Sequence, residues 1–501
     1  MPKTTPFRKV AVFGDLHLTD NACSLKLPVL DWALAEAAKA GVDAVIGIGD
    51  LTASGTAKQN ALLQARLKKS RLPFYSTPGN AELRSSDPAG RAGQFFPVPM
   101  EAGIFFVDTS SAKPEEADLS ALAALPAGSK ALLCSHYPPE QWGDPAREVL
   151  EKALARGAVS AVIAGHTHAD GPHTLRGLDP DKASGGPPSF LLFQRSEADG
   201  EWKRSCIAMP GVDPADWTEA ERASFLKILG VSCMWEPLET LAEATKLAIP
   251  VLELRHGALD GESPALYEGI SAWREAGGRI LSFHLPNLRP GEGEKGCELY
   301  ENVCAALRLG VDRVTLHVPE VTAERFPQEK ERLTENFLKL IGPLLEKGVT
   351  VGIENLHTRF QKWGDDQRNF GCTIKECSEW ISHLRARTGS DLVGFHLDIG
   401  HARNNVPFSR DEYVSDYFGV PDLPLKGCHF HQICKLEENR FKNHLLLEDF
   451  YGKIIPLSGC FLARRAGLIP PETPIILEIN VPGGGCRCYR KFLEKFGRFQ
   501  G

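Results

Sequence analysis

Acidic, amide and imidazole side chains follow several short apolar runs in the first 170 residues of this chain. Asp15 and His17 come after "VAVFG", Asp50 after "VIGIG", Asn80 after "YSTPG", His136 after "LLCS", and His166 and His168 after "VIAG". Open α/β sheets form their sites where strands end, and mixed Asp, Asn and His ligands suit borderline divalent ions such as Mn, Fe or Zn. One such residue alone would ordinarily be structural or solvated, but ligand chemistry at so many strand ends predicts a metal site.

The loop "TPGNAEL", residues 77–83, raises a question about the chemistry of this site. The carbonyl oxygen of Asn80 can bind a metal ion, whereas Ala81, the next residue, can move no proton. Glu82 is close in sequence, but the pattern does not place its carboxylate. The loop is therefore either part of a catalytic site that lacks its acid or an ordinary turn.

The blocks "GDLH", "GD", "GNAE", "SH" and "GHTH" occur in this order over about residues 8–210, and together they resemble the calcineurin-like metallophosphoesterases. The resemblance implies an α/β/β/α sandwich that hydrolyses phosphomonoesters or phosphodiesters with two divalent ions. It also implies the ligands: Asp15, His17 and His168 for one ion, Asn80, His136 and His166 for the other, and Asp50 as the bridge. Such a pair of ions activates water and stabilises the phosphoryl oxygens during in-line attack.

The chain departs from that family at Ala81, where the family commonly has a His next to the leaving group. General acid catalysis contributes roughly 10² to 10⁴ in rate, so substrates with poor leaving groups should suffer most. We therefore do not expect efficient diester cleavage, although the metal site itself stays intact. A metal site kept for binding without turnover is the alternative.

A second set of ligand-type residues lies at or near the carboxyl ends of predicted strands in the second half of the chain. These are His284, His317, Glu354, Asp398, His401, His429 and Glu478. Barrel enzymes build their sites on this face, and "LDIGH" brings Asp398 and His401 close enough for both to face it. The other interpretation, polar caps on strands, suits two or three such residues and not the whole set. His256 and His357 are predicted near the same rim, where they could contact a substrate.

The second half resembles the xylose isomerase-like barrels, which include sugar-phosphate isomerases and epimerases and the endonuclease IV group. The resemblance spans about residues 226–495 and rests on "FHLP", "TLHVP", "GIEN", "LDIGH", "HFHQ", "NHLLLEDFYGKI" and "ILEIN". The isomerase-type pattern implies one divalent ion (Mn, Zn, Mg or Co) bound by Glu354, Asp398, His429 and Glu478. Glu354 and Glu478 are then also the catalytic acid–base pair that moves a proton beside a carbonyl group.

The endonuclease-type pattern adds further ligands for a cluster of ions: His284, His317, His401 and His444. That pattern has Asp two residues before the last His, whereas this chain has Lys442, whose ammonium would repel a third cation. His431 and Gln432 also depart from the usual acidic end of the corresponding strand motif. The resemblance therefore favours small-molecule chemistry over DNA repair, and nucleic acid is the less expected partner.

The elements that must position the first site are alternating strands and helices. The runs "KVAVFGD", "DAVIGIGD", "PFYSTPGN", "ALLCSHY" and "SAVIAGHTH" predict buried strands, and "PVLDWALAEAAKAG" and "PAREVLEKALARG" predict helices. "SFLLFQRS" and "WKRSCIAM" follow the loose segment "DKASGGPP" with no helix between them, which predicts a mixed sheet. Thr218 and Glu221 have capping-box spacing, so a helix should begin there. We predict domains at 1–212 and 229–501, joined by a linker and lead-in helix at 213–228.

The elements of the second half repeat regularly. Strands are predicted at 229–235, 249–257, 279–287, 311–319, 349–357, 392–401, 425–433 and 473–480. Most gaps hold a helical pattern, such as "PLETLAEATKLA", "ALYEGISAWREAGG", "ERLTENFLKLIGPLLEKG" and "IKECSEWISHLRARTG". Eight strand–helix repeats over about 270 residues match the order and size of a (β/α)8 TIM barrel. The predicted fold class is thus α/β, with an N-terminal sandwich followed by a barrel.

The composition of the 501 residues, 43% hydrophobic and 24% charged, is that of a soluble globular protein with more than one domain. The formal net charge of -7 gives no support for broad binding to nucleic acid or membranes. No run approaches the roughly 20 apolar residues of a membrane span, and the N-terminus shows no signal segment. The 13 scattered cysteines suit a reducing cytoplasm, and for the one close pair, Cys486 and Cys488, we favour no metal role.

These patterns predict a cytoplasmic two-domain metalloenzyme, a phosphoester hydrolase joined to an isomerase-like barrel, with a small phosphorylated or sugar-like substrate. The covalent link suggests that both sites handle one metabolite in sequence. Two alternatives stay open: processing of nucleic-acid ends or abasic sites, and a metal-binding scaffold without catalysis.

Overall fold

The computed structural model describes residues 6–86, 96–98, 102–256, 263–291, 293, 296–357, 368–405, 412–436 and 441–497. The chain divides into two compact units. Unit 1 comprises Met1–Asp213 and Tyr451–Gly459, and unit 2 comprises Pro214–Phe450 and Cys460–Gly501. No helix among the described residues combines the length and the apolar character needed to cross a bilayer.

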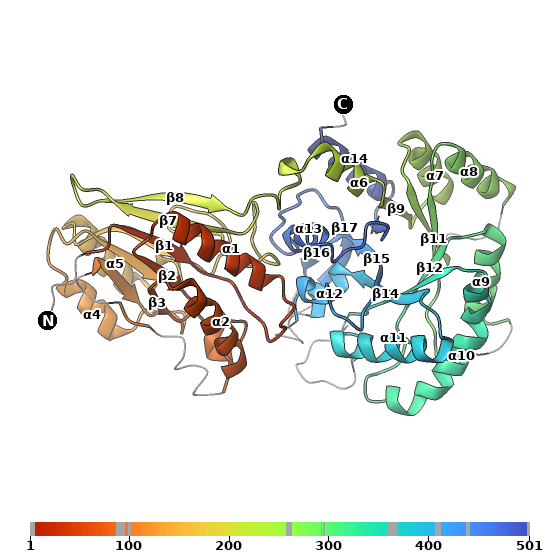
Figure 1. The fold of residues 1–501 in the computed structure, drawn as a ribbon, viewed down its shortest axis with the longest axis horizontal. Coiled ribbons are helices and arrows are strands. Elements are labelled where there is room, and N and C mark those ends of the chain that lie inside the picture. The colour runs from red at the N-terminus through yellow and green to blue at the C-terminus, as the bar shows by residue number, and fades with distance from the viewer. Residues whose placement is uncertain are drawn as a thin grey trace. The chain divides into compact units, whose positions relative to one another are not determined.

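Unit 1 contains two sheets (Figure 1). The first has the order β3-β2-β1-β7-β8, built from β1 (Lys9–Phe13), β2 (Ala44–Ile48), β3 (Phe74–Thr77), β7 (Ser189–Arg195) and β8 (Trp202–Ala208). The second has the order β4-β5-β6, built from β4 (Ile104–Val107), β5 (Ala131–Ser135) and β6 (Val159–Ala164). Strand β7 pairs antiparallel with both β1 and β8, whereas β1, β2 and β3 are parallel. The mixed sheet predicted from "SFLLFQRS" and "WKRSCIAM" is confirmed.

The two sheets of unit 1 pack face to face, because one buried cluster contains side chains of both, among them Val12, Ile46, Leu132 and Ile163. Helices cover the outer faces: α1 (Lys26–Lys39), α2 (Ala57–Ser70), α4 (Glu116–Ala124) and α5 (Asp144–Ala155). The outer face of the second sheet has its own cluster, in which Leu133 packs with Leu122 of α4 and Leu150 of α5. The predicted α/β/β/α sandwich is therefore confirmed.

Unit 2 opens with α6 (Glu219–Leu226), whose first turn has the predicted capping box. The Thr218 hydroxyl accepts the N–H of Glu221 at 3.2 Å, and the Glu221 carboxylate accepts the N–H of Thr218 at 2.7 Å. These two bonds satisfy backbone donors that a helix start leaves open. The helix begins where the sequence predicts it.

The strands of unit 2 form a closed parallel barrel in the order β10-β11-β12-β13-β14-β15-β18-β9. They are β9 (Leu229–Cys233), β10 (Val251–Arg255), β11 (Ile280–His284), β12 (Arg313–His317), β13 (Thr350–Glu354), β14 (Val393–Asp398), β15 (Leu425–Phe430) and β18 (Ile475–Leu477). Most of their residues are buried, as expected for strands covered on both faces. The predicted TIM barrel is confirmed, and Gly257, the last residue of the predicted strand 249–257, lies outside the described residues.

Helices follow the barrel strands, and Figure 1 shows α8 to α11 on the outside of the barrel. They are α7 (Pro237–Lys246), α8 (Pro264–Glu275), α9 (Glu298–Leu309), α10 (Phe326–Glu346), α11 (Ile374–Thr388), α12 (Ile399–Asn405), α13 (Ser458–Arg465) and α14 (Gly484–Lys495). Apolar side chains on their inner faces, such as Leu299 of α9 and Trp380 of α11, are buried. The helices thus cover the barrel and leave the strand ends to carry the site.

All eight predicted barrel strands end two or three residues earlier than expected, and after two of them another described helix or strand begins within two residues. The strand predicted at 392–401 stops at Asp398, and α12 begins at the next residue. The Asp398 carboxylate accepts the N–H of His401 at 2.6 Å, so it caps the helix and ends the strand. The strand predicted at 425–433 divides at His431, after which β16 (Gln432–Lys435) pairs antiparallel with β17 (Phe441–Leu445).

Candidate metal centres

The polar residues at the strand ends of unit 1 converge on Asp50. One carboxylate oxygen of Asp50, Oδ2, lies 3.5 Å from Nε2 of His17, and the other, Oδ1, lies 3.4 Å from Nε2 of His136. Both Asp50 and these two histidines are buried. The carboxylate therefore lies between two groups of ligand-type side chains, as a bridging ligand would.

These two groups are the ones that the resemblance to the calcineurin-like metallophosphoesterases implied. Oδ1 of Asn80 lies 3.0 Å from Nε2 of His136 and 3.2 Å from Nδ1 of His166. Ligand atoms of Asp15, His17 and His168 all lie within 4.8 Å of one another. Nδ1 of His136 donates to the carbonyl oxygen of Ile48 at 3.1 Å, so Nε2 presents its lone pair to the oxygens of Asn80 and Asp50. Acceptors that face one another in this way fit a divalent cation.

The backbone at these positions adopts an unusual conformation. Asp15, His17, Asp50, His166 and His168 have φ angles of 50°, 48°, 51°, 68° and 54°. Left-handed conformations are uncommon for residues other than Gly and store of order 1–3 kcal/mol each. Such strain persists where the surrounding structure holds it, and it gathers at functional sites. The strain in unit 1 is concentrated on the candidate ligands.

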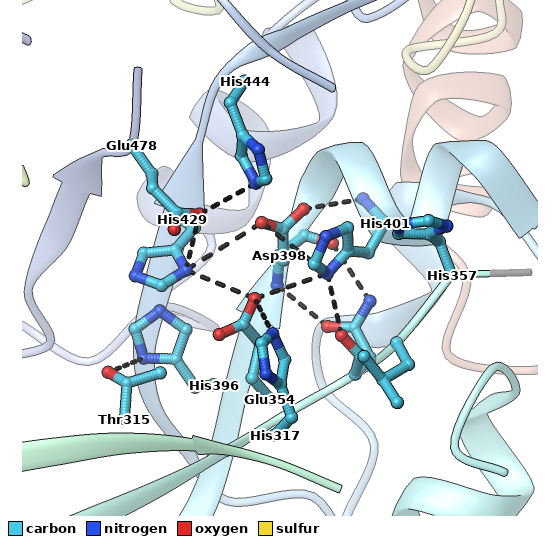
Figure 2. A network of polar contacts seen from close by, with 12 residues as sticks. Thr315, His317, Glu354, His357, His396, Asp398, His401, His429, His444 and Glu478 are labelled. Atoms are coloured by element: carbon cyan, nitrogen blue, oxygen red, sulfur yellow. Dashed lines mark hydrogen bonds and ion pairs between the residues drawn. The ribbon is translucent and has the colours of Figure 1, made fainter. Parts of the chain in front are cut away.

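The ligand-type residues of the barrel surround Glu354, as Figure 2 shows. Oε2 of Glu354 lies 3.1 Å from Nε2 of His284. Oε1 lies 3.5 Å from Nε2 of His317, 3.3 Å from Nδ1 of His401 and 3.4 Å from Nδ1 of His429. Glu354 is fully buried, so its carboxylate is shared among histidines that come from four different elements.

The other side of the barrel centre is formed around Glu478 and Asp398 (Figure 2). Nδ1 of His429 lies 3.2 Å from Oε2 of Glu478 and 3.9 Å from Oδ2 of Asp398. Nε2 of His444 lies 3.2 Å from the same Glu478 oxygen. The four residues of the isomerase-type pattern, Glu354, Asp398, His429 and Glu478, present ligand atoms within 4.8 Å of one another.

The barrel residues fit a divalent ion on a second ground. Among the described candidate ligands of the barrel, four buried atoms have no hydrogen-bond partner: Oε1 of Glu354, Nδ1 of His429, Nε2 of His444 and Oε2 of Glu478. Buried polar atoms ordinarily find partners. His284 and His317 direct their Nδ1 atoms to oxygens of Leu285 (3.0 Å) and Asn287 (2.6 Å), which leaves Nε2 to face Glu354. An ion among these atoms would supply the missing partner.

One protein family matches the part of the chain that contains the first site. Residues 8–170 match the calcineurin-like phosphoesterase family. That stretch contains every ligand-type residue of unit 1 described above. No curated protein matches the chain.

Solved structures resemble parts of this chain. A D-tagatose 3-epimerase-like protein shares 17% identity at a TM-score of 0.38, over 54% of this chain and 98% of its own. Endonuclease IV from Thermus thermophilus shares 22% identity at a TM-score of 0.35, over 53% of this chain and 99% of its own. A dimetal phosphatase from Danio rerio shares 16% identity at a TM-score of 0.29, over 40% of this chain and 99% of its own.

Glu82 and Ala81, which the sequence left open, now have positions in the candidate site of unit 1. One Glu82 oxygen accepts the N–H groups of Asp50 at 2.9 Å and Gly79 at 2.8 Å, and the other accepts the N–H (2.9 Å) and hydroxyl (3.1 Å) of Thr52. These bonds tie the loops after β2 and β3 together and occupy the carboxylate, so Glu82 positions Asp50. The side chain of Ala81 is fully buried, and its N–H donates to Asp50 at 2.7 Å.

Lysines that the sequence analysis missed lie near the candidate site of unit 1. Lys26 is buried and donates to the backbone carbonyl of His17 at 3.1 Å and to Asp179 at 3.0 Å. Burial and the Lys182 ammonium hold the pKa values of His17 and His168 well below the usual range. Neutral imidazole is the form that binds metals. Lys182 belongs to the segment "DKASGGPP", whose loop-like pattern gave no sign of a role at the site.

Negative charge dominates the barrel centre. Burial would raise the pKa of Glu354, but the nearby His317 and His429 hold it well below its usual range. Burial would lower the pKa of His429, yet Glu253 and Glu354 raise it to about 10. An imidazole among carboxylates takes up a proton readily, because their negative charge stabilises the protonated ring. A divalent ion would supply that positive charge.

The structure brings three further residues to the barrel centre. Nε2 of His431 lies 3.0 Å from both oxygens of Asp398. Arg255, at the end of β10, pairs with Glu478. Glu253 is buried in the middle of β10 and contacts His429. A charged residue inside a buried strand is the signal that would have identified Glu253 from the sequence, because such a group needs a buried partner.

The remaining predicted barrel residues lie beside these groups or outside them. Nδ1 of His256 lies 3.4 Å from the backbone oxygen of His284, and the ring of His357 lies 4.9 Å from that of His401. Lys442, which we expected to repel a third cation, is exposed on β17. His431 is a basic residue that contacts Asp398.

Proposed function

We propose that unit 1 is a two-metal phosphoesterase. The position of Asp50 carries this proposal, because its two oxygens face two separate groups of ligand-type side chains. The family match over residues 8–170 supports it. Asp15, His17 and His168 would hold one divalent ion, Asn80, His136 and His166 the other, and Asp50 would contact both.

Residues around the proposed metal site determine which substrates it is expected to hydrolyse. The two ions, when bound, supply Lewis-acid stabilisation of the phosphoryl oxygens and activate the attacking water. Glu82 keeps Asp50 and Gly79 in register through its hydrogen bonds. Ala81 offers no proton to the departing oxygen, so esters whose leaving group is stable as an anion are the expected substrates.

The direct test is metal quantification followed by a hydrolysis screen. Protein loaded with Mn, Zn or Mg is assayed with p-nitrophenyl phosphate, bis-p-nitrophenyl phosphate and alkyl phosphate esters. We expect turnover of the aryl esters to exceed that of the alkyl esters. Protein with a full complement of metal that hydrolyses none of these compounds would instead be the non-catalytic scaffold.

For the barrel we propose a metal-dependent isomerase- or epimerase-type activity on a small sugar-like or phosphorylated substrate. The convergence of Glu354, Asp398, His429 and Glu478 supports it. Glu354 and Glu478 come from opposite sides of the centre, so one can remove a proton beside a carbonyl group while the other returns it. The ion, when bound, polarises the substrate oxygens.

A second candidate for the barrel is phosphodiester cleavage in nucleic acid. It is favoured by the sharing of Glu354 between His284 and His317 on one side and His429 on the other, which suits more than one ion. A panel of ketoses and ketose phosphates, assayed beside a duplex with an abasic site, distinguishes the two. One ion per barrel with epimerised sugar supports the first activity, and several ions with a nicked duplex support the second.

A further inference from the structure

Glu253, on β10, forms hydrogen bonds with side chains of three other strands of the barrel. Its Oε1 accepts a hydrogen bond from Nε2 of His429 on β15 at 2.8 Å. Its Oε2 accepts the hydroxyl of Ser282 on β11 at 2.8 Å and that of Thr315 on β12 at 2.9 Å. Because a carboxylate can only accept, Nε2 of His429 must carry a proton.

The protonation of Nε2 determines which atom of His429 faces the candidate ion. In the neutral ring, which is the form that binds metals, a proton on Nε2 leaves Nδ1 with a lone pair for a ligand bond. That atom lies 3.2 Å from Glu478 and 3.4 Å from Glu354, and it has no hydrogen-bond partner among the described residues. Glu253 therefore lies on the opposite side of the ring from the metal centre.

A buried cation accompanies this carboxylate. Arg313, on β12, donates to Nδ1 of His396 at 2.9 Å, and the His396 ring lies 4.1 Å from that of His429. Both Arg313 and His396 are buried. The positive charge of the Arg313 guanidinium offsets the negative charge of the nearby Glu253 carboxylate, which would otherwise be costly to bury.

The barrel makes space for this pair through two glycines. A Cβ atom on Gly427 would lie 2.5 Å from both Arg313 and His396. A Cβ atom on Gly352 would lie 2.9 Å from Arg313 and 3.1 Å from His396. A side chain at either position would displace Arg313 or His396, so glycine at both positions leaves room for these two side chains.

We propose that Glu253 is a positioning residue for the barrel metal centre: it holds the Nε2 proton of His429 and so directs Nδ1 to the ion. This inference rests on the proposed function to the extent that the barrel binds a divalent ion. A role in stability alone would need only the hydroxyl contacts with Ser282 and Thr315. The contact with His429 is the one that links Glu253 to metal binding.

The test uses the full chain and isosteric changes. Glu253→Gln keeps the shape of the side chain but presents an amide to His429. Ser282→Ala and Thr315→Val are matched controls, since each removes one hydrogen bond to Glu253 and none to His429. The barrel ions are defined as those lost in Glu354→Gln, and their Zn²⁺ affinity is measured by chelator competition.

We expect Glu253→Gln to weaken Zn²⁺ binding about 10- to 100-fold, as changes to the partners of metal-bound histidines do. The two controls should lower the melting temperature and leave the affinity largely unchanged. In the Zn²⁺-loaded protein labelled with ¹⁵N-histidine, the hydrogen-bonded Nε2 proton of His429 should shift or vanish only in Glu253→Gln.

Two results would overturn the proposal. One is wild-type affinity in Glu253→Gln with an unshifted Nε2 proton. The other is an equal loss of affinity in all three variants, which would make Glu253 a structural group only. A failure of the proposed function is distinguishable, because Glu354→Gln would then remove no ion from the protein.

Discussion

The two candidate metal centres direct their ligands toward the site in different ways. In unit 1, Asp15, Asp50 and His168 lie in left-handed conformations after strands. In the barrel, His284, His317, Glu354 and Asp398 are the last residues of β11, β12, β13 and β14. Among the described candidate ligands of the barrel, only His444 has a positive φ angle.

Strand register sets the level of the barrel ligands. His317 pairs with Glu354, and Asp398 pairs with His429, in neighbouring parallel strands. Hydrogen bonds between the barrel strands therefore hold these ligands in position. In unit 1, by contrast, each loop with a left-handed residue is held by the close contacts around it. We therefore expect the site of unit 1 to be the more sensitive to atoms added close to the backbone. The barrel site should be the more sensitive to changes in the charge of its ligands.

The largest expected effect separates the two centres outright. Asp50→Asn should lower phosphoester hydrolysis about a thousandfold, since an amide no longer offers a full charge where two ions need it. Barrel metal content should stay unchanged. Asp31→Asn is the matched control, because Asp31 pairs with Arg66 in α1 and α2. Retained hydrolysis with retained metal would remove Asp50 from the bridging role.

The converse change addresses the barrel. Glu478→Gln should weaken barrel metal binding by about a hundredfold or more, above the effect of altering an outer partner, and leave hydrolysis by unit 1 intact. The two sites belong to separate compact units, so their losses should be independent. Metal analysis and p-nitrophenyl phosphate turnover are measured on the same sample. If turnover falls by half, the two centres are coupled and the prediction that they are independent is wrong.

Adding a single methyl group should test how sensitive the site of unit 1 is to atoms added close to the backbone. A Cβ atom on Gly79 would lie 2.3 Å from Oδ1 of Asp50, so Gly79→Ala should displace that carboxylate. A displacement near 1 Å lowers turnover about 10²-fold. Gly342→Ala in α10 is the control, since no atom lies within 4 Å of a Cβ there and a helical alanine adds about 0.5–1 kcal/mol of stability. Unchanged kcat/KM in Gly79→Ala would mean that the loop relaxes freely.

The smallest expected effect concerns the missing acid. Ala81→His should raise kcat/KM for alkyl esters more than for p-nitrophenyl phosphate, because only an alkoxide needs a proton to leave. The gain should be far below the roughly 10² to 10⁴ of a positioned acid, since the side chain of Ala81 is fully buried. Both substrates are assayed at matched metal occupancy. An equal change on both would show that position 81 is not next to the leaving group.

The sequence by itself determined the fold class and the candidate ligands. Apolar runs of strand length, helical periodicity between them and polar residues after them are local patterns, and parallel strands bring their carboxyl ends to one edge. The capping box at Thr218 and the barrel repeats are likewise local. Asn80 and Glu354 could therefore be predicted as ligands from the sequence alone.

Only the tertiary structure decided which polar groups act together. Glu253 meets His429, 176 residues away in sequence, because their strands lie in one barrel and their side chains point inward. Glu82 could have faced the ions, but its hydrogen bonds to Asp50, Gly79 and Thr52 assign it to the loops. His431 contacts Asp398 because β15 ends at Phe430, one residue before His431. Such contacts depend on register and side-chain direction across the sheet, which no local pattern encodes.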